Sequence, residues 1–122
     1  MVETCTSKNQ TVAIVLTSDH GSFYYNHGSS VEIEHHTPLI IFSNYEKYNK
    51  SAASKNPLII NQIDICPGLA ALVGVEIPKM SFGSLRAPFT NFLTKKSAEC
   101  YTKENSNQLK FIRKVMAKIY KL

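Results

Sequence analysis

The chain has 122 residues, 43% of them hydrophobic and 19% charged, which is enough apolar material for one compact domain and too little charge for wholesale disorder. The net charge of +5 is uneven: residues 1–78 carry four lysines against seven carboxylates, whereas residues 79–122 carry ten Lys and Arg against two Glu. No apolar run approaches the roughly 18 residues that span a bilayer, and the start, MVETCTSKNQ, lacks a signal-peptide core, so we expect the chain as it stands to have neither a membrane span nor an export signal.

The first element is a strand over residues 11–17, where an uninterrupted, partly β-branched run predicts a central strand buried on both faces. Residues 21–36 are polar and glycine-bearing and predict a loop. Pro38 then opens a second short apolar run, residues 39–42, which predicts another buried strand. Residues 43–56 have no periodicity and predict an exposed loop.

Two helices follow. Asp64 is a candidate N-cap with Pro67 in the first turn, and Gly74 is a natural stop. The chain ends in an amphipathic helix over residues 106–121, apolar on one face and rich in lysine on the other. Basic amphipathic helices also bind membranes and nucleic acids. We expect instead a surface helix that packs its apolar face on the domain, and no nucleic-acid partner.

The cysteines Cys5, Cys66 and Cys100 are far apart and form no C-x-x-C pair, which argues against a zinc site built on thiolates. One disulfide can form among them, but the spacing does not choose the pair. Cys66 falls early in the first helix, where we expect it to be buried against the sheet.

The order strand, loop, strand, helix predicts an α/β fold. In parallel sheets of this class, ligands bind outside the carboxyl ends of the strands. Asp19 and His20 fall at that end of the first strand, and carboxylate and imidazole are ligands that a divalent ion takes. Gly21 permits the turn that lets both side chains converge. The alternative is a capped turn in which Asp19 only accepts backbone N–H bonds.

Longer stretches around this turn resemble a known family. TVAIVLTSDHG, then NHGSS, then HTPLIIFS resemble the alkaline-phosphatase superfamily. QIDICPGLAALVGVEIPK at residues 62–79, with SFGS at 81–84 and NSNQL at 105–109, is similar to the GPI ethanolamine phosphate transferases, most of all to the paralogue acting on the second mannose. The resemblance covers about residues 11–115 and implies a partial alkaline-phosphatase-like sheet flanked by helices, with residues 1–104 as the C-terminal part of a catalytic domain and residues 105–122 as a basic helix.

The resemblance also implies a ligand set. Asp19 and His20 match the paired ligands of one metal, His27 matches a ligand of the second, and the likeness implies that the metal is zinc. The link Ser22–Asn26 departs from the family pattern because it is aromatic and one residue shorter, which leaves His35 and His36 as rivals of His27. Thr37 to Leu39 match a strand start.

The family's nucleophilic threonine and its earlier metal ligands match nothing here, and Thr11 and Thr17 are not placed to substitute. By resemblance, the chain is therefore part of a metal-dependent transferase that moves phosphoethanolamine from phosphatidylethanolamine onto a mannose of the GPI precursor. The expected setting is the lumenal side of the endoplasmic reticulum membrane, with a membrane-embedded partner subunit.

Two other interpretations stay open: a non-catalytic remnant of that domain, or another phosphodiesterase or sulfatase of the superfamily. We expect the 122 residues alone not to turn over substrate. A parallel sheet that lacks several strands exposes apolar edges, so we also expect poor solubility in isolation.

Overall fold

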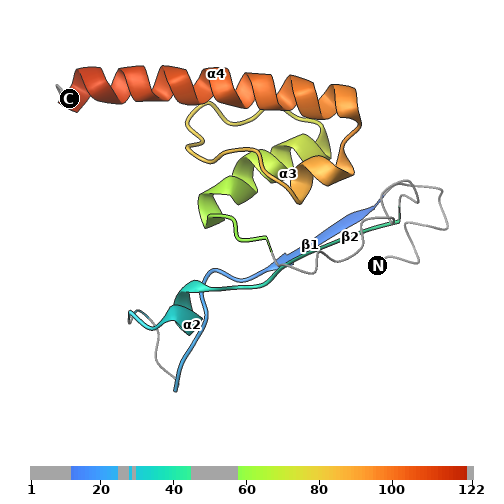
Figure 1. Ribbon diagram of the computed structural model, residues 1–122, viewed down its shortest axis with the longest axis vertical. Coiled ribbons are helices and arrows are strands. Elements are labelled where there is room, and N and C mark those ends of the chain that lie inside the picture. Colours follow the sequence, from blue (N-terminus) through green and yellow to red (C-terminus); the bar gives the residue numbers. More distant parts are fainter. Residues whose placement is uncertain (1–11, 25–27, 29, 45–57, 121–122) are drawn as a thin grey trace. The chain divides into compact units, whose positions relative to one another are not determined.

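The computed structural model describes residues 12–24, 28, 30–44 and 58–120 (Figure 1). The chain divides into two compact units, residues 1–50 and residues 51–122, which are described separately. Helices and a small sheet occur together, so the expected α/β class is confirmed.

The first unit contains a two-stranded sheet of β1 (Ala13–Thr17) and β2 (Leu39–Ser43). Ala13 pairs with Ser43 at one end of the ladder, and Thr17 pairs with Leu39 at the other. Asn44 closes the first end, since its side-chain oxygen accepts the Val12 N–H at 2.7 Å and its own N–H donates to the Val12 carbonyl at 3.2 Å. The strand start expected after Pro38 is confirmed.

Three expectations for this unit are wrong. The two strands are antiparallel, so this sheet is not the parallel one assumed from the order of elements. Neither strand is buried as expected: most of β1 is exposed, with Leu16 at 56%, and β2 has no buried residue, with Phe42 at 59%. Two strands and one short helix are too little structure to cover both faces in the described part of the unit. The third concerns residues 21–36, expected as a loop, which include the four-residue helix α2 (Glu32–His35) with Glu34 buried.

The second unit begins with a 3-10 turn, Gln62–Asp64, that leads into α3 (Ile65–Val73). The helix stops at Gly74, as expected, because this residue adopts the left-handed conformation (φ 80°) that glycine tolerates best. A second 3-10 turn, Phe89–Phe92, packs beside α3. Phe89 is fully buried there, and a Cβ on Gly68 would lie only 2.2 Å from its ring.

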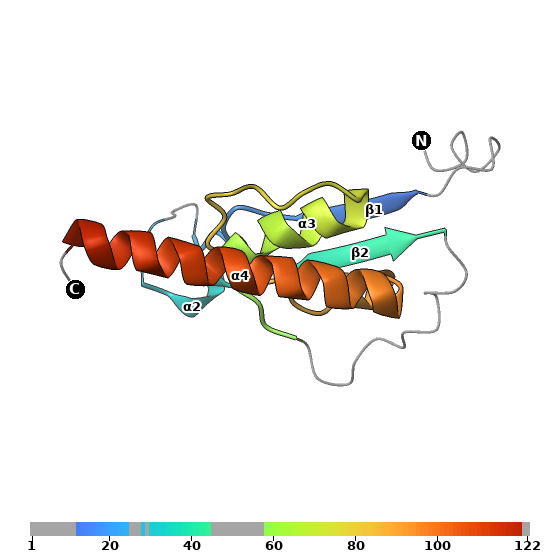
Figure 2. The same ribbon diagram turned by 90° about the horizontal axis from the view of Figure 1, so that it is seen from above.

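The last helix, α4 (Lys95–Tyr120), is 26 residues long and starts eleven residues before the expected 106. The earlier start has a local cause, because the Thr94 hydroxyl accepts the Ser97 N–H at 3.2 Å and so caps the first turn. Figures 1 and 2 both place its C-terminal part beyond the N-terminal end of α3. Because α4 runs through position 104, no break in structure marks that position, and the division into residues 1–104 and 105–122 stays a prediction.

Two buried polar side chains hold the loop between α3 and the second 3-10 turn. Asp64 accepts the Ser84 N–H at 2.7 Å, and Asn105 accepts the Leu85 N–H at 2.8 Å. Asn105 also donates to the Gly83 carbonyl at 3.0 Å. Since both side chains are about 4% exposed or less, these bonds satisfy backbone groups that water does not reach.

Asp64 lies where the sequence places an N-cap, but its carboxylate does not cap α3. It accepts the N–H of Asn61 at 3.2 Å, which stabilises the 3-10 turn before the helix. The expected role of Asp64 as a side-chain cap is therefore wrong, because the carboxylate points to Asn61 and to the loop at Ser84.

Candidate metal centre

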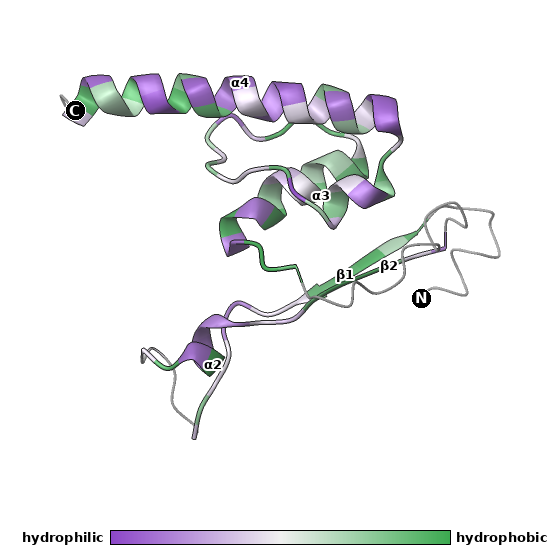
Figure 3. Cartoon of the chain, viewed as in Figure 1, coloured by the Kyte–Doolittle hydropathy of each residue, from purple (hydrophilic) through white to green (hydrophobic). Residues whose placement is uncertain are grey.

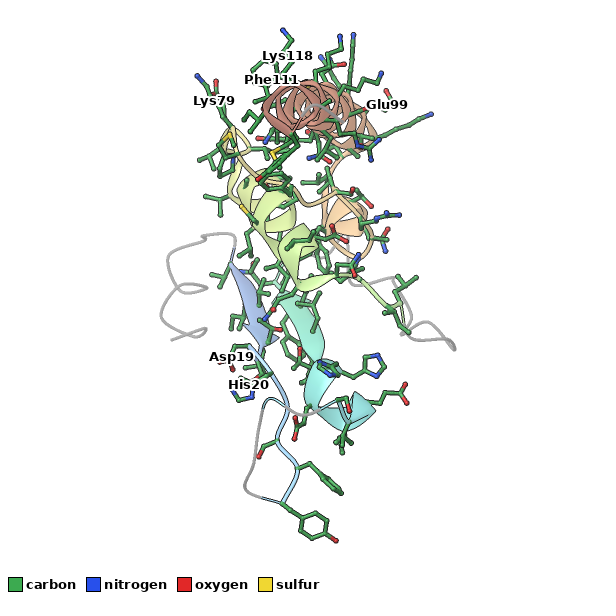
Figure 4. The ribbon with its side chains drawn as sticks, turned by 90° about the vertical axis from the view of Figure 1, so that its left-hand side faces the viewer. Asp19, His20, Lys79, Glu99, Phe111 and Lys118 are labelled. Atoms are coloured by element: carbon green, nitrogen blue, oxygen red, sulfur yellow. The ribbon has the colours of Figure 1, made fainter. Side chains whose placement is uncertain are left out.

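The candidate site lies where the chain leaves β1. The Ser18 hydroxyl donates to the His20 carbonyl at 2.8 Å, a short-range bond that turns the backbone directly after the strand. The turn places neighbouring side chains on one side instead of opposite faces. His20 Nε2 and Asp19 Oδ2 are 3.5 Å apart, and Figure 4 shows the two side chains next to each other.

A backbone contact sets the tautomer of His20. Its Nδ1 lies 2.7 Å from the Gly21 carbonyl oxygen. A carbonyl oxygen only accepts, so Nδ1 carries the hydrogen and the neutral ring has its lone pair on Nε2. Nε2 is the atom that faces Asp19. Metal-bound histidines are commonly oriented by such a bond from their second nitrogen.

The Asp19 carboxylate is stabilised in its ionised form. The backbone N–H of His20 donates to Oδ1 at 3.0 Å and is the main cause of the lowered pKa of Asp19, and the nearby positive charge of protonated His20 adds to it. This bond is also the one expected of a simple capped turn. One carboxylate oxygen of Asp19, Oδ1, therefore makes the backbone bond expected of a capped turn, while the other, Oδ2, faces the His20 ring.

The spacing of the pair fits a zinc ion. Two ligand atoms, each about 2.1 Å from zinc and at a tetrahedral angle, lie about 3.4 Å apart. The 3.5 Å between His20 Nε2 and Asp19 Oδ2 is close to that value. A tetrahedral site needs further donors, and the described residues contain no group of three His, Cys, Asp or Glu that could hold an ion.

The third expected ligand, His27, lies outside the described residues, so its role stays a prediction. Its rivals are both exposed, His35 in α2 and His36 directly after it. His36 Nδ1 lies 3.5 Å from Oε1 of Glu32, the first residue of α2. Within the described part of the chain, neither rival joins Asp19 and His20 in a three-ligand group.

Glycine is required at position 21 for a packing reason that the sequence did not reveal. Its N–H donates to the Glu34 carbonyl at 3.0 Å, and a Cβ there would lie 2.1 Å from the Ile33 carbonyl oxygen. The residue has no unusual backbone angle among those described, so close approach to α2, and not freedom to turn, requires glycine. The turn that carries Asp19 and His20 is thereby fixed against α2.

The thiols do not extend the site. Cys66 is exposed, so its expected burial against the sheet is wrong, and Cys100 is exposed as well. Both are free, so they are not paired with each other. Cys5 lies outside the described residues. Of the loop aromatics, Tyr24 is 82% exposed and its ring packs edge to face on Phe23, with centroids 4.5 Å apart.

Comparison with known proteins gives one informative likeness. Over 77 residues, 62% of this chain, the sequence is 40% identical to the catalytic subunit of GPI ethanolamine phosphate transferase 2 from Homo sapiens. The chain spans only 8% of the length of that protein. No protein-family model and no solved structure matches the chain. The likeness supports the transferase family that the motifs indicate.

Proposed function

We propose that these residues form part of the metal-binding half of a phosphoethanolamine transferase domain of the alkaline-phosphatase superfamily. The observation that carries the proposal is the 40% identity to a GPI ethanolamine phosphate transferase over 77 residues. The turn after β1 agrees with it, because a carboxylate oxygen and an imidazole nitrogen, two zinc-ligand atom types, lie 3.5 Å apart there.

In this proposal Asp19 and His20 hold one divalent ion, which by ligand chemistry is zinc, and His27 holds the second. Two such ions, when bound, supply charge stabilisation for the attacking and leaving oxygens of a phosphoryl transfer. Asp19 and His20 position an ion. The Gly21 carbonyl keeps the His20 Nε2 lone pair aimed at it, and the His20 N–H keeps Asp19 ionised.

The remaining parts of the proposal come from the family. The attacking hydroxyl lies outside these 122 residues, the donor is phosphatidylethanolamine, and the acceptor is a mannose of the GPI glycolipid. The reaction takes place at the lumenal face of the endoplasmic reticulum membrane beside a membrane-embedded partner subunit. The second mannose is the proposed acceptor position.

A graft tests this proposal. The matching segment of the human transferase is replaced by the corresponding residues of this chain, and phosphoethanolamine transfer is measured in cells that lack the human enzyme. We expect the chimera to restore transfer and the same chimera with Asp19→Ala not to restore it. A chimera that reaches wild-type abundance in the endoplasmic reticulum but transfers nothing would refute the assignment.

A non-catalytic remnant is the second candidate, favoured by the fact that the described residues bring two ligands together but not three. Zinc titration of the 122-residue chain separates the two candidates. Weakened binding in both His20→Ala and His27→Ala supports a retained site. Binding that neither substitution changes supports the remnant.

A further inference from the structure

The C-terminal half of α4 carries an unbalanced positive charge. From Asn105 to Tyr120 the helix holds four cations and no carboxylate: Lys110, Arg113, Lys114 and Lys118. Within the described chain, none of these four lies within ion-pair distance of a carboxylate. Cations in a last helical turn are favoured by the helix dipole, but that effect reaches only Lys118.

The same half of α4 also exposes large apolar side chains. Phe111 is 62% exposed, Ile119 65% and Tyr120 61%, while Ile112 is buried and marks the face that packs on the second unit. The expectation that the apolar face packs on the domain therefore holds for the middle of the helix but is wrong for its end. Figure 3 shows apolar and polar residues together on these last turns.

The apolar side chains and the cations lie on different faces of the helix. At about 100° per residue, the exposed apolar side chains span about half of the circumference, from Phe111 at one border, past Ile112 and Ile119, to Tyr120 at the other. The four cations fall on the opposite half. An apolar half beside a lysine-rich half is the arrangement of helices that lie in a membrane interface, with the lysines at the level of the headgroups.

A neighbouring turn extends the pattern. The Gln108 side chain donates to the carbonyls of Pro78 and Ser81, which holds the turn between them against α4. Lys79 and Met80 lie in that turn, and Met80 is 63% exposed. Figure 4 looks along α4 and labels Lys79, Phe111 and Lys118 on one side of the helix and Glu99 on the other. Glu76 is the one carboxylate in the adjoining loop segment 75–80.

We propose that this surface, defined as Lys79, Met80, Phe111, Lys114, Lys118 and Ile119, binds the surface of an anionic lipid bilayer. The charge complements anionic headgroups, and the exposed apolar side chains complement the acyl region just below them. In the described part of the chain no helix is long and apolar enough to cross a membrane, so the mode is adsorption at the interface. The proposal does not depend on the transferase assignment.

Two other anionic partners fit less well. Nucleic acid takes cations on its phosphates, but it offers no counterpart for the aliphatic Met80 and Ile119. An acidic protein would satisfy the lysines, yet the apolar side chains lie around half of a projecting helix end, and a fluid surface covers that shape without a preformed groove. The test below distinguishes both partners from an anionic lipid surface.

The test is flotation of the purified 122-residue chain with vesicles of phosphatidylcholine alone or mixed with phosphatidylserine. Flotation is chosen because aggregated protein sinks. We expect binding only to the anionic vesicles and loss of binding in high salt. At about 1 kcal/mol per lysine near an anionic surface, the pair Lys114→Glu and Lys118→Glu weakens partitioning about thirtyfold or more.

The matched control reverses the same charges at the other end of the helix, Lys95→Glu with Lys96→Glu, and should bind almost as the unmodified chain does. A Phe111→Trp variant adds a direct readout, since its fluorescence should shift to the blue on anionic vesicles and not with polyglutamate or DNA. Equal binding to neutral vesicles, equal loss in the control pair, or a blue shift with polyglutamate or DNA would each overturn the proposal.

Discussion

Replacing Asn105 with leucine should open the second unit locally. The substitution keeps the branching and the number of heavy atoms of the side chain but removes both of its hydrogen bonds, the one it accepts from the Leu85 N–H and the one it donates to the Gly83 carbonyl. Each buried backbone group left without its partner costs about 1–3 kcal/mol. The sum is on the order of 3 kcal/mol, a large fraction of the stability of a small unit.

Hydrogen exchange of backbone amides measures this loss without requiring a cooperative melt. A loss of about 3 kcal/mol speeds exchange by opening roughly a hundredfold, and we expect that acceleration at Leu85 and in the buried turns of α3 and α4. Asn107→Leu is the control, since Asn107 is exposed on the same helix. If the two variants exchange alike, Asn105 does not hold the loop and the reasoning fails.

The other predictions concern the two units separately. Asp19→Asn and His20→Ala should each weaken zinc binding at least tenfold in a competition titration, while His36→Ala should leave it unchanged; equal effects would remove Asp19 and His20 from the site. Because its pKa is lowered, Asp19 of the metal-free chain should titrate with a midpoint at lower pH than an ordinary aspartate, which carboxyl-carbon NMR measures. Gly68→Ala should destabilise the second unit by about 1–2 kcal/mol, since the overpacking against Phe89 exceeds the gain in helix propensity; unchanged hydrogen exchange in α3 would contradict this. The purified chain should show no phosphodiesterase turnover, and activity that Asp19→Ala abolishes would refute this.

The sequence predicted those elements whose boundaries have local causes. Pro38 marks the start of β2, and Gly74 ends α3 with a left-handed residue, so both ends follow from single-residue chemistry. The start of α4 also has a local cause, the Thr94 cap. The prediction missed it because the apolar periodicity becomes clear only from residue 106 onward, and a single threonine before a polar run is a weak signal.

Features that depend on contacts between residues far apart in the chain could not be predicted from the sequence. Nothing in the letters around Gly21 reveals that its Cβ position is occupied by the Ile33 carbonyl, or that a helix forms at Glu32. The prediction that β1 is buried was wrong for a related reason. An apolar run predicts what a strand would bury if other layers were present, and the described part of the first unit has no such layers.

The stretches that carry the family resemblance have a structural explanation in the second unit. Asp64, Gly83 and Asn105 come from three separate motifs, yet hydrogen bonds and close backbone packing join them around one loop. A Cβ on Gly83 would lie 2.0 Å from the Ile63 carbonyl oxygen, so glycine is required there by packing. Likeness in these motifs is therefore evidence about the fold of the second unit rather than about its chemistry.

The evidence for metal chemistry therefore comes from the first unit alone, and there the exposure of the two side chains limits how tightly they could bind an ion. His20 and Asp19 have side chains 47% and 81% exposed, so water and counterions compete for both ligand atoms. Two exposed ligands bind zinc weakly, because most of the affinity of a structural or catalytic zinc site comes from three or four protein donors held together. The Gly21 carbonyl and the His20 N–H orient the pair, and the function proposed above requires that the remaining donors for an ion come from outside the described residues of this unit.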